Sequence, residues 1–312
     1  MAVEGSEDHL AWEARQRTPA AIAAAVAGVF IFIGTVWRGL TLSDLPRNGI
    51  AESLDRAAEP GPVGELESLK VGTYEVFDEQ AFGVITSSVV VSIGYLALGW
   101  TLTDLAVAAR ARRPEFPRLL VYVPMIAAIL QALATLLSAI ATNVAISDFL
   151  GGPRTVDAAT DVTTTGLGVF AQLLGLPGAL GLALALIMIA LNAMRVGLLT
   201  RFMGVLGIIT GALQILPFGG PLPVVQSFWL LMLSLLFSGR WAGGTPPAWR
   251  TGKAEPWPSG AEVREQRRRA AAERRGEAYE PPEAAEPEPA PESVGAGPSP
   301  STSARKRKRK RR

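Results

Sequence analysis

Six long runs of apolar residues constrain the fold of this chain more than any other feature of its sequence. A helix needs about 20 mostly apolar residues to cross the hydrocarbon layer, where the backbone finds no hydrogen-bond partner outside the helix. The runs predict membrane-spanning helices at residues 20–40, 81–109, 119–141, 167–194, 202–216 and 222–238. The fifth run is short for a full crossing, and the first is too long for a cleaved signal segment. We therefore expect an all-α, polytopic membrane protein whose residues 19–240 form a six-helix transmembrane bundle.

The connections between the runs differ in charge, and this predicts their side of the membrane. Basic residues collect after the second and fourth runs, at Arg110, Arg112, Arg113, Arg118, Arg195 and Arg201. Residues 41–80 instead hold nine acidic and three basic side chains. Because short cytoplasmic loops carry the excess of Lys and Arg, we expect the basic turns inside the cell and the acidic loop 41–80 outside. With six crossings, both termini, including a leader at residues 1–18, are then cytoplasmic.

Residues 241–312 form a charged, proline-rich tail that we expect to be disordered and cytoplasmic. The tail contains 16 Lys and Arg against 10 Asp and Glu, and too few apolar side chains to build a core of its own. Trp241 is expected at the lipid headgroups, whereas Trp249 and Trp257 fit either the headgroup zone or a solvated linker. The chain ends in eight consecutive basic residues: Arg305, Lys306, Arg307, Lys308, Arg309, Lys310, Arg311 and Arg312.

This terminal basic run predicts a polyanionic contact. On a tail leaving the inner face of a bilayer, anionic lipid is the expected partner, at about 1 kcal/mol per basic residue near the surface. An acidic protein or the phosphates of a nearby nucleic acid remain alternatives. No aromatic side chain interleaves the run, so sequence-specific recognition of nucleic acid is not expected.

The residue inventory removes several kinds of chemistry. The chain has no cysteine, which excludes disulfides, thiolate metal sites and cysteine nucleophiles, and its one histidine is His9 in the polar leader. A single imidazole cannot build a zinc site or a Ser-His-Asp triad. We therefore expect neither an enzyme nor a protein with a metal or cofactor.

Neutral amides within the apolar runs are the candidate site. Gln131, Gln172, Gln214 and Gln226 are expected either to converge on a polar cavity for a small neutral solute or to fasten neighbouring helices together. Asp104, near the cytoplasmic end of the second run, is expected to be a hydrated interfacial acid, with a role as a coupling-ion ligand as the alternative.

Small residues and prolines predict how the helices pack. Gly207 with Gly211, and Ala24 with Gly28, have the small-x-x-x-small spacing that lets helix backbones approach. Packing within the bundle explains this spacing, and homodimerisation is the alternative. Pro177 predicts a kink in the fourth helix, or a break of the kind seen in transporters.

The segment from Leu191 to Phe218 resembles uncharacterised multi-pass membrane proteins of high-GC Gram-positive bacteria. In them a span ends in an N-A-x-R-V-G-L-L motif, turns, and re-enters as a glycine-rich helix. The likeness rests on Asn192, Arg195, Gly197, Arg201, Gly204 and Gly207. It implies a location in the bacterial cell membrane and a tight inner turn, and brings no activity with it.

The sequence therefore favours an integral membrane protein that acts without catalysis. We expect an interaction or scaffolding protein whose basic tail binds anionic lipid or an acidic partner. The alternative is a transporter or channel for a small solute, with a neutral polar cavity.

Overall fold

The computed structural model describes residues 4–46, 49, 52, 54–55, 58, 61–215, 223–241, 244–255, 264–265, 268–270 and 274–275. The chain divides into two units, Met1–Trp257 and Pro258–Arg312. The terminal basic run, residues 305–312, lies outside the described residues.

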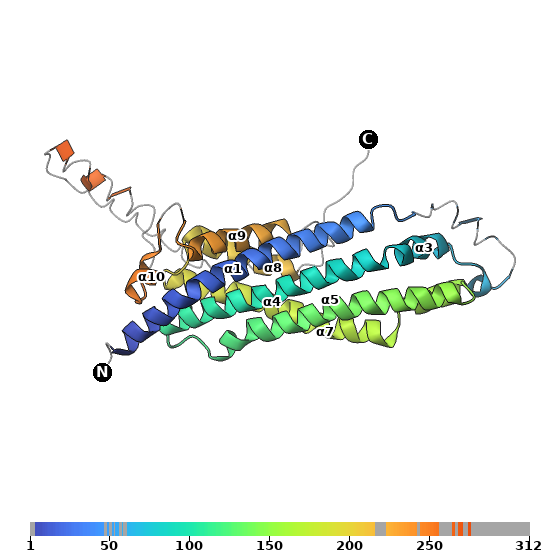
Figure 1. Cartoon of the computed structure of the whole chain (residues 1–312), viewed down its shortest axis with the longest axis horizontal. Helices are drawn as coiled ribbons and strands as arrows, with labels where there is room; N and C mark the ends of the chain where they lie inside the picture. Colours follow the sequence, from blue (N-terminus) through green and yellow to red (C-terminus); the bar gives the residue numbers. More distant parts are fainter. Residues whose placement is uncertain are drawn as a thin grey trace, which may run out of the picture. The chain divides into compact units, whose positions relative to one another are not determined.

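Long helices dominate the first unit (Figure 1). They are α1 (Glu4–Thr41), α4 (Ala81–Arg112), α5 (Leu119–Gly151) and α7 (Gly166–Arg195), followed by the shorter α8 (Arg201–Ile215) and α9 (Val224–Phe237). Four small elements connect or follow them: η1 (Val63–Glu65), α3 (Val71–Glu79), α6 (Val156–Asp161) and α10 (Pro247–Thr251). The described residues contain no strand beyond one isolated bridge between Glu67 and Thr155. The expected all-α fold is thus confirmed for this part of the chain.

Four stretches of the described chain are long and apolar enough to cross a membrane: Leu10–Thr41, Ala81–Arg112, Leu119–Gly151 and Val156–Arg195. These stretches indicate a membrane protein. The fifth and sixth runs are helical too, but α8 and α9 have 15 and 14 residues, so each is about 21–23 Å long. That is shorter than the hydrocarbon core of roughly 30 Å. The number of crossings therefore stays a prediction.

The outer surface of the bundle is apolar. In the most apolar window of each of the four candidate spans, only 33% to 39% of the residues are buried inside the chain. Large side chains such as Ile33, Ile126, Leu173 and Phe202 are more than half exposed. Because monomers in water rarely expose contiguous apolar patches of this extent, this surface fits lipid as its solvent.

Small residues let neighbouring helices approach closely. α1 packs on α4 and α9, α4 on α5, α5 on α7, and α7 on α8. A Cβ added to Gly99 of α4 would lie 2.5 Å from the Cβ of Ala128 on α5. A Cβ at Gly207 of α8 would lie 2.8 Å from that of Ala190 on α7. A Cβ at Gly28 of α1 would lie 3.0 Å from the carbonyl oxygen of Ser227 on α9. These small-residue faces are thus covered by helices of the same chain.

The fourth apolar run forms one unbroken helix. α7 is helical from Gly166 to Arg195 and includes Pro177 in its interior. The alternative of a broken, transporter-like helix is therefore wrong for this segment. The backbone of α7 stays hydrogen-bonded instead of offering a run of free carbonyls to a solute.

The described part of the acidic loop folds over the end of the bundle. The backbone nitrogen of Ser68 donates to the carbonyl oxygen of Arg154 at 2.8 Å, and that of Val156 donates to Leu66 at 2.9 Å. α3 packs on α5, and Tyr74 meets Phe149 edge to face with ring centroids 5.1 Å apart. This end of the bundle, formed by η1, α3 and α6, is called the acidic end below.

Candidate functional site

At the opposite end of the bundle, buried polar contacts join segments that are far apart in the chain. This end is formed by the α4–α5 connection at residues 113–118, the α7–α8 connection at residues 196–200, and α10, and is called the arginine-rich end below. At this end residues 244–255, which the sequence assigned to the disordered tail, are folded. α10 spans Pro247–Thr251 and is followed by Gly252 in the left-handed region at φ +70°. The predicted start of the tail at residue 241 is therefore wrong.

Trp249 anchors α10 to the bundle. Its side chain is buried, and its Nε1 donates to the carbonyl oxygen of Leu198 at 3.0 Å. Its ring meets that of Phe237 edge to face with centroids 5.7 Å apart. Just beyond α10, the backbone nitrogen of Glu255 donates to Val196 at 3.2 Å. Trp249 is thus a core residue and not an interfacial anchor or a linker residue.

A buried ion pair lies beside α10. Nη1 and Nη2 of Arg112 donate to Oε1 and Oε2 of Glu13 at 2.6 and 2.7 Å, and these side chains are only 0% and 3% exposed. Arg112 also donates from Nε and Nη2 to the carbonyl oxygen of Ala248, and from Nη1 to that of Ala108. All five of its N–H donors are therefore used, which is the condition under which a buried guanidinium is tolerated.

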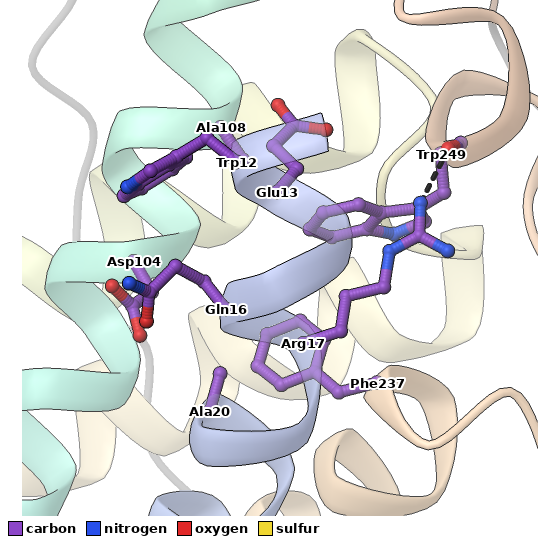
Figure 2. Close-up of a pocket in the computed structure, with 9 residues that line it drawn as sticks. All are labelled: Trp12, Glu13, Gln16, Arg17, Ala20, Asp104, Ala108, Phe237 and Trp249. Atoms are coloured by element: carbon purple, nitrogen blue, oxygen red, sulfur yellow. Dashed lines mark hydrogen bonds between the residues drawn. The ribbon is translucent and has the colours of Figure 1, made fainter. Parts of the chain in front are cut away.

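Arg17 completes the cluster from α1. Its guanidinium donates to the carbonyl oxygen of Trp249 and lies 4.9 Å from the centroid of the Trp249 ring (Figure 2). Arg112 lies 5.4 Å from the same ring. Cations near an indole face are attracted by its quadrupole, more strongly where water is excluded. We call Glu13, Arg17, Arg112 and Trp249 the α10 clamp.

A very small cavity adjoins the α10 clamp. It holds about 20 Å³ and is lined by residues of α1 and α4 together with Phe237 and Trp249. Figure 2 shows Gln16 and Asp104 on one side of α1, and Arg17 with Phe237 and Trp249 on the other. Asp104 Oδ2 and Arg17 Nε are buried without a hydrogen-bond partner. The volume suits about one water molecule, so the cavity cannot hold a solute.

The four candidate amides lie in different places. Gln214 Nε2 donates to Gln226 Oε1 at 3.2 Å, which joins α8 to α9. Gln131 lies where α5 meets Gly178 of α7, and its Oε1 is buried without a partner. Gln172 is exposed and lines a cavity near the acidic end. The structure thus brings one of the possible pairs together, as expected for amides that fasten helices. Convergence of all four on one site remains a prediction that no contact supports.

The cavity at Gln172 lies near the acidic end and is lined partly by polar side chains. It holds about 290 Å³ between α3, α5 and the start of α7. Ser138, Thr142 and Thr165 supply hydroxyl groups, while Tyr74 and Phe77 form an aromatic wall. Burial raises the pKa of the Tyr74 phenol, so it stays neutral well above physiological pH. The lining therefore offers neutral hydrogen-bonding groups and no charge.

The α10 clamp was missed by reading the sequence, although part of it carries a signal. In PPAWRTG, proline at the first helical position and glycine just after the last is the usual asymmetry of a short helix. That signal predicts α10 but not its burial, because Glu13 and Arg112 are 99 residues apart in the chain. No family model, no curated protein and no solved structure matches this chain.

Proposed function

We propose that this chain is an integral protein of the bacterial cell membrane that works without catalysis, as an interaction or scaffolding protein. In this proposal it crosses the membrane six times, with both termini in the cytoplasm. The bundle serves as a fixed base in the bilayer, and the tail makes contact with anionic lipid or an acidic partner protein.

The observation that carries the proposal is the anchoring of α10. A tail attached through a mobile linker would need no buried contacts at its root. Here the chain up to Glu255 is held by the fully bonded Arg112, the ring of Trp249 and a backbone hydrogen bond to Val196. Because residues up to Glu255 are held on the bundle, the tail begins at a fixed position, as a scaffold requires.

The positions of α8 and α9 support a cytoplasmic location for both termini. α8 begins at Arg201, directly after the α7–α8 connection, and α9 ends at Phe237, which contacts Trp249. Both helices therefore start or finish at the arginine-rich end. Whether α8 and α9 cross the membrane and return, or turn back inside the bilayer, the two termini of the chain remain on the same side of the membrane. The excess of arginine at this end favours the cytoplasmic side.

The proposed contact of the tail is tested with vesicles. The full chain is reconstituted into phosphatidylglycerol vesicles with its C-terminal tails exposed on the outside. The tails are expected to bind the lipid of neighbouring vesicles, so that the vesicles cluster and sediment together. A full-length variant with glutamine at every position from 305 to 312 should lose vesicle clustering. A variant with lysine at all eight positions keeps the charge and should retain it. Equal clustering by the glutamine and lysine variants would refute a contact made by the terminal run.

A carrier for a small neutral solute is the second candidate, and the cavity at Gln172 is the observation that favours it. Its volume of about 290 Å³ is close to the lower limit for ligand sites. Proteoliposomes containing the chain can be mixed with hyperosmotic glycerol or urea while swelling is followed by light scattering. The scaffolding proposal predicts that the proteoliposomes swell no faster than liposomes without protein. Faster swelling that is abolished by Gln172→Leu would favour the carrier instead.

A further inference from the structure

A second cavity at the arginine-rich end lies apart from the α10 clamp. It is a groove of about 510 Å³ between the end of α4 and the start of α5. Its lining includes Val107, Arg110 and Ala111 from α4, and Arg118, Val121 and Tyr122 from the other side. None of these residues belongs to the clamp or to the candidate amides. The groove is large enough for the head of a lipid or a similar ligand.

Two arginines give the groove a positive charge that the neighbouring acid does not neutralise. The guanidinium of Arg110 donates to the carbonyl oxygen of Phe116, a buried residue of the connecting turn, which fixes the position of its side chain. Arg118 is exposed and has no ion pair within the described residues. Glu115, the acidic residue of the same turn, lies 3.5 Å from Arg113 instead. One fixed and one free guanidinium are thus available to an anion.

The rest of the groove is apolar and continues into the outer surface of the bundle. On α5, Tyr122, Ile126, Ile129 and Leu133 are all at least 42% exposed and follow the i, i+4, i+7, i+11 spacing of one helix face. On α4 the same spacing links the exposed Val89, Ile93, Leu96 and Trp100 to Val107 in the groove. Two exposed apolar stripes therefore lead to a mouth that carries two arginines.

From this arrangement we infer that the groove binds the phosphate of an anionic phospholipid, with the acyl chains along the α4 and α5 stripes. The inference rests on the proposed membrane location. The guanidinium fork matches phosphate oxygens, and an exposed tyrosine is typical of the headgroup zone. A soluble phosphate would use the arginines but leave the apolar stripes without a role. The headgroup of a zwitterionic lipid also carries a positive charge, and this charge would be repelled by the two arginines of the groove.

The test uses the full chain in a neutral detergent, with phosphatidylglycerol or phosphatidylcholine added in steps. The melting temperature, followed by intrinsic tryptophan fluorescence, gives the lipid concentration at half-saturation. Phosphatidylglycerol should stabilise the chain at lower concentration than phosphatidylcholine does. Arg118→Gln should weaken the effect of phosphatidylglycerol at least fivefold, as expected when a direct guanidinium–phosphate hydrogen bond worth about 1 kcal/mol or more is lost. Arg118→Lys should recover part of this loss.

Arg201→Gln is the matched control. Arg201 is an exposed arginine at the same end of the bundle, and it does not line the groove. Its substitution should leave the half-saturation concentration within about twofold of the unaltered chain, because a single exposed charge outside the site contributes only weakly. Equal losses in Arg118→Gln and Arg201→Gln would overturn the inference, since the lipid would then respond to general charge.

Two further arms separate other sources of the effect. Millimolar inorganic phosphate should not compete with phosphatidylglycerol, and full competition would reassign the groove to a soluble anion. The full-length variant with glutamine from 305 to 312 should keep the response, and its loss would move lipid binding to the tail. Membrane fractionation of cells reports on the proposed location independently. If the chain is found in the membrane fraction but Arg118→Gln does not weaken the effect of phosphatidylglycerol, the lipid site in the groove is refuted and the proposed membrane location stands.

Discussion

At the arginine-rich end, charged side chains from distant segments are buried together, whereas at the acidic end they stay in contact with solvent. Glu13 and Arg112 are 3% and 0% exposed, while Glu75 and Arg154, which lie 3.1 Å apart, are 50% and 41% exposed. Both are carboxylate–guanidinium pairs, but the first makes two hydrogen bonds at 2.6 and 2.7 Å and the second makes one at 3.1 Å. Their energetic roles differ because a charge left unpaired in a dry interior carries a desolvation penalty that a charge in water does not.

The comparison also separates what each end can do. The arginine-rich end uses its buried pair to fasten α10, and presents the exposed Arg118 at the surface groove. The acidic end has a neutral cavity of about 290 Å³ and, among the described residues, the exposed ion pair of Glu75 with Arg154. Substitutions at the first end should therefore change stability strongly, and equivalent ones at the second end should change it little.

The largest effect is expected for Glu13→Gln. It leaves the guanidinium of Arg112 buried without its counter-charge, which typically costs about 3–5 kcal/mol. Unfolding in mixed micelles, followed by circular dichroism, measures the change. The double variant Glu13→Leu with Arg112→Met should be less destabilised than Glu13→Gln alone, because no isolated charge remains. A loss below about 1 kcal/mol in Glu13→Gln would show that the pair is hydrated in solution.

Trp249→Ala should come next, at about 3 kcal/mol. The substitution leaves a void between α10 and Phe237, and removes the donor to the carbonyl oxygen of Leu198. The same unfolding assay gives the size of the loss, and limited proteolysis should show earlier cleavage near residue 250. Trp241→Ala, at a partly exposed tryptophan six residues before α10, serves as the control. Similar losses in both variants would argue against a specific anchor.

Gly99→Ala tests the close helix contact between the two ends. The added Cβ would lie 2.5 Å from that of Ala128, so α4 and α5 must separate, at about 1–3 kcal/mol. Gly39→Ala, on α1, places its Cβ in open space and should be neutral or slightly stabilising. Equal melting temperatures for the two variants would mean that the α4–α5 interface is looser than described.

The smallest effect is expected for Glu75→Gln at the acidic end. The pair with Arg154 is about half exposed, and such pairs contribute at most about 1 kcal/mol. The loss should shrink further in high salt, whereas that of Glu13→Gln should not, because screening acts on solvated charges. If Glu75→Gln destabilised the chain as much as Glu13→Gln, the proposed difference between the two ends would be wrong.

The positions of helices were largely predictable, because hydrophobicity is a property of each residue in turn. The run at 167–194 predicted α7 to within one residue at each end, and the run at 202–216 did the same for α8. The end of α5 was missed by ten residues, since the helix continues to Gly151 past the apolar run that ended at 141. An apolar run predicts which residues can lie in lipid. A helix can continue beyond that run, because its end depends on backbone hydrogen bonds.

The candidate site was predicted poorly, because it depends on which helix faces meet. Gln214 and Gln226 lie on α8 and α9, which follow one another in the chain, and the sequence order implies that they are neighbours. Gln131 and Gln172 were grouped with them by residue type alone, and their surroundings differ.

By itself, the sequence determined that apolar helices dominate the chain, that arginines gather between certain helices, and that no cysteine and only one histidine are present. Only the tertiary structure decided that Trp249 is buried, that Arg112 pairs with Glu13, and that Arg118 lies exposed beside Arg110 at the groove between α4 and α5. The physical reason is that composition and periodicity are read along one dimension. A contact between residues far apart in the chain depends on how the helices are rotated and shifted against one another.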